Sequence, residues 1–468
     1  MHNDISEVCC ILELYEKSTL SLNEAVKLSD RICMFEENDS KSAYYKANKD
    51  ECISYIQNHA GYMKGKCLTH KCNLCVINRW CNFYRKKRQK NEEKLKTPTY
   101  ADFFCGAGGL SLGFTDAGFR LSLANDVQNC CIDTLSFNHP EIPKKYVVVG
   151  DIDDILNSIE ERSRYKCIDV VVGGPPCQGF SKANRQRIIN DPRNHLYRSF
   201  VKAVDILSPA FLVMENVRGI MKVSEQIIDD FKSIGYSVSV RLVNACDFGV
   251  PQNRERVIFI GNRIGVNNDE LFSDLFEMSS NIPKYVLKNA LYGLQPLSAR
   301  TIPNDNTCEN KESGYTFTIS PKTKRTKYLS LINGKHKNPI LFNHKARYNN
   351  SRDIEIYRRL NQGDDSLDPK IADIMPYKRR EHIFRDKYYK LEAESLCKTI
   401  TAHMKYDCNM YIHPEQARGL TPREAARVQS FPDYYYFRGS YTKTYMQIGN
   451  SVPPLLSRCI AQIIRKYL

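Results

Sequence analysis

The chain has 468 residues, 42% of them hydrophobic and 26% charged, which is typical of globular proteins with two or three domains. It contains no run of about 18 apolar residues, and it does not begin with a basic stretch followed by an apolar one. We therefore expect neither a membrane span nor a signal peptide, and we expect the protein in the cytoplasm. A net charge of +15 favours a polyanionic partner such as nucleic acid, although it also fits a merely solvated surface.

Residues 1–98 predict a helical extension that is rich in cysteine and ends in a basic run. Because the cysteines of the chain are scattered and the compartment is reducing, we expect most of them to be free thiols. Four cysteines in the extension have the spacing Cys67-x4-Cys72-x2-Cys75-x5-Cys81. This cluster suits a tetrahedral thiolate site for zinc or an iron–sulfur cluster, and its last three members resemble the cluster loop of some DNA-repair glycosylases. Free thiols remain the alternative.

A strand, a glycine-rich loop and a helix are predicted next, over residues 100–114. The glycines of the loop let the backbone approach a ligand where a side chain would clash, which indicates a nucleotide-type pocket. The following strand ends at Asp126, about where an acidic residue meets a ribose hydroxyl pair. A third strand leads to Asp151, whose carboxylate could accept a hydrogen bond from an adenine amino group, cap the next helix, or do both.

The stretch over residues 168–181 places a cysteine at the end of a strand. A β-branched run stops at Gly173-Gly174-Pro175-Pro176, which neither continues a central strand nor starts a helix. Cys177 is therefore displayed at the carboxyl end of a strand, where ligands bind in open α/β sheets, and it is a candidate nucleophile. A buried cysteine in a tight turn is the alternative.

A polar loop follows Cys177 and carries Ser181, Lys182, Arg185 and Arg187. Such a loop beside a nucleophile suits a lid that grips phosphates, and it equally suits an ordinary surface loop.

Two later strands bring charged residues to the sheet. The strand over residues 210–214 delivers Glu215 to the same sheet edge as Cys177. A hairpin-like pair then ends in Gln252-x-Arg254-x-Arg256. The two arginines are two residues apart, so they share one face of a strand that is otherwise apolar.

These stretches, taken in order, resemble the signature blocks of DNA (cytosine-5) methyltransferases. The resemblance covers about residues 99–468, and six blocks in one order are very unlikely to arise by chance. The blocks are Phe104-Cys105-Gly106-Ala107-Gly108-Gly109, Pro175-Pro176-Cys177-Gln178, Glu215-Asn216-Val217, Gln252-x-Arg254-x-Arg256, the stretch from Leu420 to Asp433 and the stretch from Gln447 to Pro454.

The resemblance implies an α/β fold, with the Rossmann-like sheet of S-adenosylmethionine-dependent methyltransferases and an inserted, smaller DNA target recognition domain. The segment without family blocks is rich in basic and aromatic residues, which suits contacts to phosphates and bases. We expect five parts. They are the extension (1–98), the first part of the catalytic domain (99–263), the recognition domain (264–398), a connecting segment with the Thr-Pro-Arg-Glu block (399–440) and the return to the catalytic domain (441–468).

The resemblance also implies a mechanism. Cytosine C5 is a poor nucleophile, so the ring must first be activated by adding a thiolate at C6. By resemblance Cys177 attacks C6, Glu215 assists at N3, Arg254 and Arg256 complete the catalytic set with Arg256 at O2, and the methyl group comes from S-adenosylmethionine. The base must leave the duplex, with DNA contacts from residues 181–187 and Thr399. The implied cofactor residues are Phe104, Gly106, Gly108, Asp126, Val127, Asp151, Ile152, Pro176, Leu196, Asn450 and Val452.

The expected partner is double-stranded DNA, bound by a monomer, and a cognate restriction endonuclease that acts on the same site is a further candidate. Two alternatives stay open. One is a transfer-RNA cytosine-5 methyltransferase of the same fold, although those enzymes usually have a Pro-Phe-Thr-type sequence where this chain has Gly179-Phe180-Ser181. The other is a DNA-binding module without activity, which the presence of Cys177, Glu215 and Arg256 disfavours.

Overall fold

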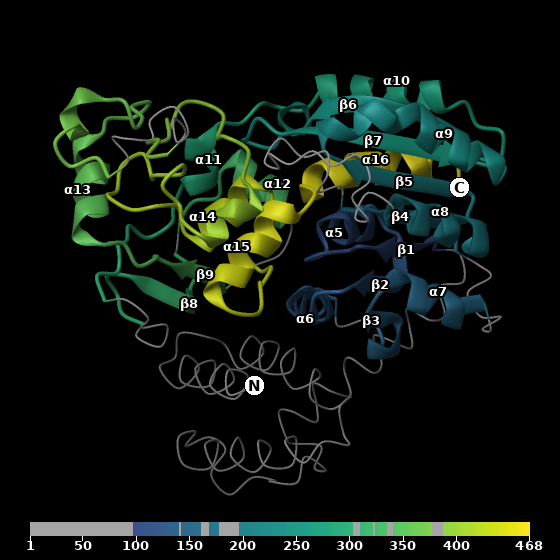
Figure 1. Cartoon of the computed structure of the whole chain (residues 1–468), viewed down its shortest axis with the longest axis horizontal. Helices are drawn as coiled ribbons and strands as arrows, with labels where there is room; N and C mark the ends of the chain where they lie inside the picture. Colours follow the sequence, from purple (N-terminus) through teal and green to yellow (C-terminus); the bar gives the residue numbers. More distant parts are fainter. Residues whose placement is uncertain are drawn as a thin grey trace, which may run out of the picture. The chain divides into compact units, whose positions relative to one another are not determined.

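A computed structural model describes the part of the chain that carries the predicted sheet (Figure 1). The described residues are 97–139, 142–160, 168–176, 196–302, 309–321, 323–334, 340–376 and 387–468. The chain divides into two compact units, residues 1–97 with 135–147 and residues 98–134 with 148–468, and the description below concerns the second unit. No helix within the described ranges is long and apolar enough to cross a membrane.

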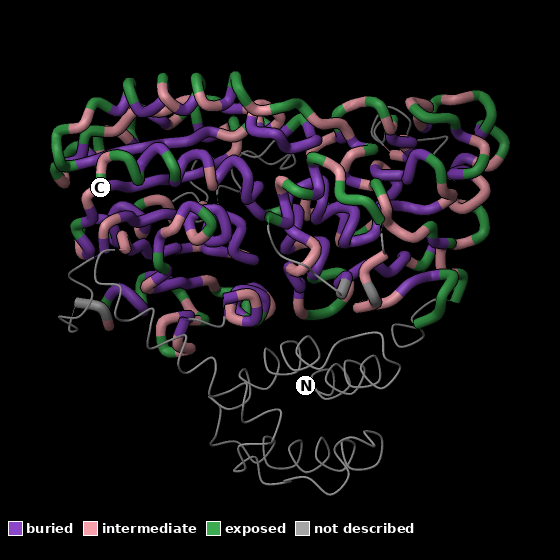
Figure 2. The backbone as a smooth tube through the Cα atoms, turned by 180° about the vertical axis from the view of Figure 1, so that it is seen from behind, coloured by how far each residue is buried: buried purple, intermediate pink, exposed green. Residues whose placement is uncertain are grey.

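A seven-stranded sheet in the order β3-β2-β1-β4-β5-β7-β6 forms the centre of this unit. Strand β1 pairs in parallel with β2 and β4, and β4 pairs in parallel with β5, whereas β7 lies antiparallel between β5 and β6. The central strands β1, β4 and β5 are buried along their whole length, as strands covered on both faces must be (Figure 2). The strands are β1 (Thr99–Phe103), β2 (Arg120–Asp126), β3 (Val147–Val149), β4 (Val170–Gly173), β5 (Phe211–Asn216), β6 (Ser237–Asn244) and β7 (Glu255–Asn262).

The predicted α/β class is confirmed, and the helices follow from the connections. Right-handed crossovers place α5 and α6 on one face of the sheet and α7 and α8 on the other, because the chain reverses its direction across the sheet after β3. The helices of this region are α5 (Gly109–Asp116), α6 (Asn129–Asn138), α7 (Ile152–Glu160), α8 (Leu196–Leu207), α9 (Ser224–Ser233), α10 (Asn268–Ser280) and α16 (Pro454–Arg465), with the short 3-10 turns η4 (Arg218–Val223) and η5 (Ala245–Phe248). The 3-10 turn η1 (Lys144–Tyr146) belongs to the first unit.

The end of the chain packs against the first helix of the sheet. A Cβ atom added to Gly113 in α5 would lie 2.5 Å from the backbone nitrogen of Arg458 in α16, and one added to Gly109 would lie 2.1 Å from the carbonyl oxygen of Val452. Only glycine permits these approaches without a shift of the backbone. The last helix is thereby held beside the glycine-rich loop, although about 340 residues separate them in sequence.

Residues 287–450 build a second group of elements, most of them around one apolar core, with α13 and η6 in a separate apolar cluster. A two-stranded antiparallel sheet, β8–β9, carries part of it. Helix α14 is buried at every position, and the core around it also contains Ala107 of the glycine-rich loop and Leu455 of α16. The elements are α11 (Leu287–Leu291), β8 (Gly314–Ile319), α12 (Lys327–Asn333), β9 (Ile340–Lys345), α13 (Ser351–Arg359), η6 (Pro369–Ile371), η8 (Ala402–Lys405), α14 (Pro422–Val428) and α15 (Tyr441–Asn450).

Candidate active site

An ion pair lies at the carboxyl end of β5. Glu215 is near the last residue of that strand, as expected, and Arg256 lies near the start of the adjacent strand β7. Arg256 Nε lies 2.8 Å from Glu215 Oε1, and the two side chains are 13% and 11% exposed. The pair is therefore largely shielded from water yet still reachable, a setting in which a carboxylate and a guanidinium can both meet a ligand.

The segment that leads to Cys177 lies beside this ion pair. Strands β4 and β5 are parallel neighbours, so both end at the same edge of the sheet. A Cβ atom added to Gly174 would lie 3.4 Å from Glu215 Oε2, and Asn216 Nδ2 donates a hydrogen bond of 2.9 Å to the carbonyl oxygen of Pro175. Cys177 itself lies outside the described residues, two positions after Pro175.

The loop after β1 has an unusual backbone. Phe104, Gly106 and Gly108 all have positive φ angles, of 56°, 53° and 82°. This conformation is natural for glycine and strained for phenylalanine, and such strain persists where the surroundings enforce it. No atom lies within 4 Å of a Cβ atom added to Gly106, so the loop presents open backbone at this point.

Two carboxylates border that loop. Asp126 Oδ2 accepts a hydrogen bond of 2.9 Å from the Gly106 amide, and burial raises the pKa of Asp126 above its ordinary value. Asn125 Nδ2 donates to the carbonyl oxygens of Val148 and Gly150, at 3.2 Å and 2.9 Å, so the ends of β2 and β3 are tied together. Asp151 follows directly and caps α7 through the Asp153 amide, at 2.9 Å. The capping role that the sequence offered for Asp151 is thus present.

The remaining predicted cofactor residues differ in how far they are exposed. Val127 is 65% exposed although it is apolar, and it follows Asp126 directly. At the other side, the carbonyl oxygen of Val452 touches Gly109, while Asn450 is exposed at the end of α15. Pro176 is exposed as well, Ile152 is buried in the first turn of α7, and Leu196 begins α8 half-buried. Open backbone, two carboxylates and an exposed apolar side chain fit a nucleoside with hydroxyl groups and an aromatic base.

Comparison with known proteins decides the family. The model of the C-5 cytosine-specific DNA methylase family matches residues 99–466. The chain belongs to that family. Among the relatives of this methylase, the Type II methyltransferase M1.HphI of Haemophilus parahaemolyticus is 33% identical over 384 residues, which cover 79% of this chain and 87% of the relative. The Type II methyltransferase M.DdeI of Desulfomicrobium norvegicum is 34% identical over 78% of this chain and 88% of its own length.

A solved structure agrees with this assignment. The crystal structure of a protein described as a DNA modification methyltransferase encoded within a prophage (E. coli) aligns with a TM-score of 0.59 and 27% identity, over 79% of this chain and 99% of that one. The expected fold and the expected enzyme class, a cytosine-5 DNA methyltransferase, are therefore confirmed.

The two arginines of the Gln-x-Arg-x-Arg block, Arg254 and Arg256, have different partners in the methylase. Arg256 meets Glu215, whereas Arg254 is completely buried and donates hydrogen bonds to three backbone carbonyls, those of Ile400, Gly449 and Ser451. Burial, followed by the nearby charge of Arg256, lowers the pKa of Arg254 well below its ordinary value. Arg254 is therefore placed to hold backbone segments together rather than to touch a base.

Sequence reasoning missed a buried acid beneath the methylase's glycine-rich loop. Asp102, in β1, is fully buried and accepts a hydrogen bond of 2.5 Å from Ser111 Oγ in α5. Burial raises the pKa of Asp102 to about 7. The available signal was an aspartate inside an apolar strand, since such a residue needs a nearby partner. Its effect is to fix α5, and with it the loop, against the strand.

Several predicted residues of the methylase lie outside the described ranges. Thr399 is described, and its Oγ1 donates a hydrogen bond of 2.5 Å to the carbonyl oxygen of Asn253. No cluster of three or more metal-ligating side chains occurs within the described ranges. The predictions that lie outside them concern Cys177, Ser181, Lys182, Arg185, Arg187, Cys67, Cys72, Cys75 and Cys81.

Proposed function

We propose that this methylase transfers a methyl group from S-adenosylmethionine to C5 of a cytosine that is flipped out of a specific duplex DNA sequence, through a covalent bond between Cys177 and C6. One observation carries the proposal. Glu215 of the Glu215–Arg256 ion pair lies beside Gly174, and the next residue, Asn216, is hydrogen-bonded to Pro175, in the segment that leads directly to Cys177.

Each side chain has a defined task in this mechanism. The thiolate of Cys177 forms a bond to C6, while Glu215 donates a proton or a hydrogen bond to N3, where the electron pair of the ring accumulates. Arg256 donates to O2 and, through its 2.8 Å contact, holds Glu215 in place. C5 then accepts the methyl group that the cofactor supplies. A base removes the C5 proton, and the electron pair of that C–H bond expels the Cys177 sulfur from C6.

The residues around the glycine-rich loop are proposed to hold the cofactor. Asp126 would accept from the ribose hydroxyls, Asp151 from the adenine amino group, and Val127 would pack on the adenine face. The open backbone at Gly106 supports a close approach of the ligand at that point. The remaining proposed cofactor residues are Phe104, Gly108, Ile152, Pro176, Leu196, Asn450 and Val452.

DNA contacts are proposed for the loop after Cys177 and for the segment over residues 264–398. Flipping a base costs a few kcal/mol of lost stacking and pairing, and contacts from Ser181, Lys182, Arg185, Arg187 and Thr399 would recover that cost. We propose that residues 264–398 choose the sequence, because they form the part without family blocks.

The relatives M1.HphI and M.DdeI are named Type II methyltransferases, which supports a role in a restriction-modification system. A cognate endonuclease and a monomer on DNA follow as proposals. Sequencing that maps 5-methylcytosine in DNA from cells expressing the chain tests the activity and yields the site. An absence of methylated cytosine in DNA, together with methyl transfer to RNA, would refute the proposal in favour of the RNA enzyme.

The covalent step has a test of its own. A duplex with 5-fluorocytosine at the mapped site should form a methylated adduct that survives denaturant only when S-adenosylmethionine is present, because fluorine cannot leave C5 as a cation. Peptide mapping should place the adduct on Cys177. An adduct on Cys105 instead would show that the nucleophile is wrongly assigned.

The extension keeps its proposed thiolate site at Cys67, Cys72, Cys75 and Cys81. Elemental analysis of anaerobically purified protein should find zinc or iron near stoichiometry. Protein that contains neither element would leave these four residues as free thiols.

A further inference from the structure

A buried polar cluster joins three segments that are far apart in the sequence. Its members are Gln252, Arg254 and Gln429, and none of the three side chains is exposed. We call them the junction cluster. They contact the backbone over residues 399–401, where the predicted recognition domain closes, and over residues 448–451, which precede the predicted cofactor residue Val452.

Arg254 connects those two segments with a single side chain. Its Nη1 donates to the carbonyl oxygen of Ile400 at 2.7 Å. Its Nη2 donates to the carbonyl oxygens of Gly449 and Ser451, at 3.1 Å and 2.9 Å. The guanidinium group is planar and rigid, so the two segments are held at a fixed separation. Burying a guanidinium among neutral carbonyls is costly, and the benefit is a defined geometry.

The two glutamines make a second connection between the same segments. The Ile400 amide donates to Gln252 Oε1 at 3.0 Å, Gln252 Nε2 donates to Gln429 Oε1 at 2.6 Å, and Gln429 Nε2 donates to the carbonyl oxygen of Ile448 at 2.8 Å. Chains of buried hydrogen bonds of this kind rigidify what they join. Residues 399–401 and 448–451 therefore depend on one another through two independent routes.

The backbones of the two segments also touch directly. A Cβ atom added to Gly449 would lie 2.1 Å from the carbonyl carbon of Thr401. Beyond the contact, each segment leads to one of the proposed binding sites. Val452 touches Gly109 of the glycine-rich loop, and Thr399 is hydrogen-bonded to Asn253 beside Arg254. A displacement at either site is thus transmitted to the junction cluster over very few bonds.

We propose that Arg254 is a positioning residue that couples cofactor binding to the binding of specific DNA. Ligand that orders residues 449–452 also orders residues 399–401 through the shared guanidinium, so the second ligand meets a segment that is already in place. The inference rests on the proposed function, since it takes Thr399 as a DNA contact and Val452 as a cofactor contact. By linkage, the cofactor must raise DNA affinity by the same factor by which DNA raises cofactor affinity.

The test uses the full chain, S-adenosylhomocysteine and a duplex that contains the mapped site. Titration calorimetry gives the affinity for S-adenosylhomocysteine with and without duplex, and fluorescence anisotropy gives the affinity for duplex with and without S-adenosylhomocysteine. In the wild type both ratios should agree at about 5- to 150-fold, the usual range of coupling between sites. A ratio of one refutes the proposal outright, whichever variants fold.

The decisive variant is Arg254→Lys, because lysine keeps the charge but cannot reach both segments with a planar fork. We expect the coupling ratio to fall towards one and the KM for S-adenosylmethionine to rise about tenfold, the effect of one lost charge-assisted hydrogen bond. The kcat at saturating cofactor should change much less than the KM. A folded Arg254→Lys protein with the wild-type coupling ratio would overturn the proposal.

Arg423 supplies a matched control. It is equally buried, in α14, and donates to the backbone carbonyls of Phe342, Pro432 and Tyr435, none of which belongs to the two segments. Arg423→Lys should lower stability and leave the coupling ratio unchanged. An equal loss of coupling in this variant would show a general effect of disturbing the core and would overturn the special role of Arg254.

If Arg254→Lys does not fold, the variant Gln252→Met tests the coupling instead. It removes the hydrogen-bonded connection through the two glutamines and leaves no buried charge without a partner. A partial loss of coupling supports the proposal, and an unchanged ratio contradicts it. Failure of the proposed function is distinguishable from all of these results, because it would appear as a wild type that methylates no duplex.

Discussion

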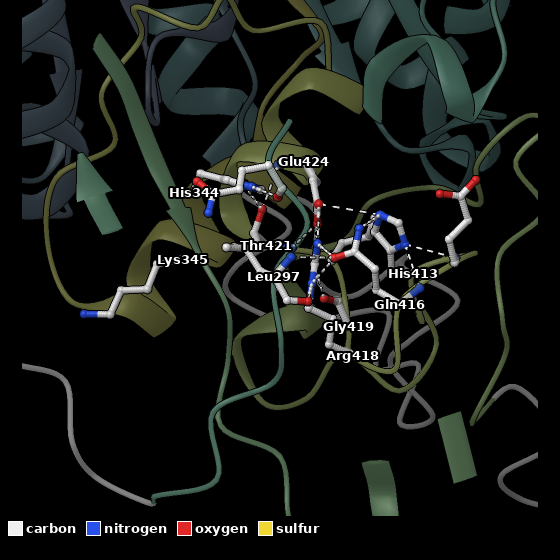
Figure 3. A network of polar contacts seen from close by, with 12 residues as sticks. Leu297, His344, Lys345, His413, Gln416, Arg418, Gly419, Thr421 and Glu424 are labelled. Carbon is white, nitrogen blue, oxygen red and sulfur yellow. Dashed lines mark hydrogen bonds and ion pairs between the residues drawn. The ribbon is translucent and has the colours of Figure 1, made fainter. Parts of the chain in front are cut away.

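Two of the shielded ion pairs among the described residues have different surroundings, one at the active edge of the sheet and one at the start of α14. Arg256 meets Glu215 through a single 2.8 Å contact, and both side chains keep some exposure. Arg418 meets Glu424 through two contacts, at 2.6 Å and 2.7 Å, and these side chains are at most 1% exposed (Figure 3). The same chemical groups therefore occur once within reach of a ligand and once sealed from solvent.

The surroundings of Glu424 explain why its ion pair is structural. Glu424 Oε2 also accepts the Thr421 amide at 2.7 Å, closing the cap of α14, and Arg418 donates further to the carbonyl oxygen of Leu297 at 3.1 Å. His413 and His344 complete this network of polar contacts (Figure 3). Saturated partners and complete burial favour stability, whereas an ion pair with residual exposure can exchange a partner for a substrate. The comparison predicts opposite consequences of mutation in the two places.

The largest effect is expected at the active edge and concerns activity. Glu215→Gln should lower the single-turnover rate of methyl transfer by about 10²–10⁴-fold, the scale of a positioned acid–base group. The melting temperature and the affinity for S-adenosylhomocysteine should stay close to those of the wild type. A collapse of cofactor affinity with an unchanged rate would show that Glu215 belongs to the cofactor site.

Mutation of the buried Arg418–Glu424 ion pair should lower stability rather than activity. Arg418→Leu leaves the Glu424 carboxylate without its buried counter-ion, and we expect a loss of about 3–5 kcal/mol in the free energy of unfolding. Denaturant titration measures the loss, and the rate of methyl transfer per folded molecule should be retained. The matched change at the active edge is Arg256→Leu, which should lower the rate and cost much less stability. Equal stability losses for the two changes would remove the distinction between the pairs.

Acid should weaken the network around Glu424. Burial lowers the pKa values of His344 and His413 to about 4, so both are neutral in the folded protein. Unfolded histidine binds its proton near pH 6.5, so between pH 6.5 and 4 the unfolded chain holds more protons and stability falls as the pH falls. Each histidine contributes up to about 1.4 kcal/mol per pH unit.

Glu424 extends the acid sensitivity to lower pH. Burial alone would raise the pKa of Glu424, but Arg418 holds it well below its ordinary value. The stability that Glu424 contributes is therefore complete above about pH 4.5 and is lost progressively as the pH falls further. Melting temperatures measured between about pH 2 and pH 7 test both steps. His413→Gln should flatten the upper step, and an unchanged profile in that variant would mean that His413 does not titrate as proposed.

The smallest effect is expected where packing, rather than charge, supports the active edge. Gly113→Ala places a Cβ atom 2.5 Å from the backbone nitrogen of Arg458 and from the Ser457 side chain, so α5 and α16 must separate. Overpacking of this kind costs about 1–3 kcal/mol, which calorimetric melting would detect. A variant as stable as the wild type would show that the two helices can adjust without cost.

Local patterns in the sequence predicted much of the fold and part of the site. The β-branched runs gave β4, β5 and β7, and the residues that follow those runs placed Glu215 beside the segment before Cys177. The bunched glycines likewise predicted a loop with open backbone, which the positive φ angles of Gly106 and Gly108 bear out. These features depend on periodicity and turn chemistry within about ten residues, so they can be recognised without any long-range contact.

The hydrogen-bond partners of Arg254 could not be predicted from local patterns. Spacing placed Arg254 and Arg256 on one face of a strand, yet Arg256 meets Glu215 while Arg254 reaches carbonyls 146 to 197 residues further along the chain. The burial of Asp102 against Ser111 was missed for a related reason, because a polar residue in an apolar run shows that a partner is needed without showing which one.

The sequence by itself determined the family, the order of its signature blocks and the residues at the ends of the strands, because short motifs specify each of these. Only the tertiary structure decided which charged side chains a ligand can reach and which ones stabilise the fold. Glu215 and Glu424 are both glutamates paired with arginine, and although the Thr421-x-x-Glu424 spacing predicts a helix cap, no local pattern shows which arginine each glutamate meets. Their roles differ because folding leaves the first at an edge that a ligand can reach and encloses the second in a saturated core, where hydrogen bonds from distant segments hold it in place.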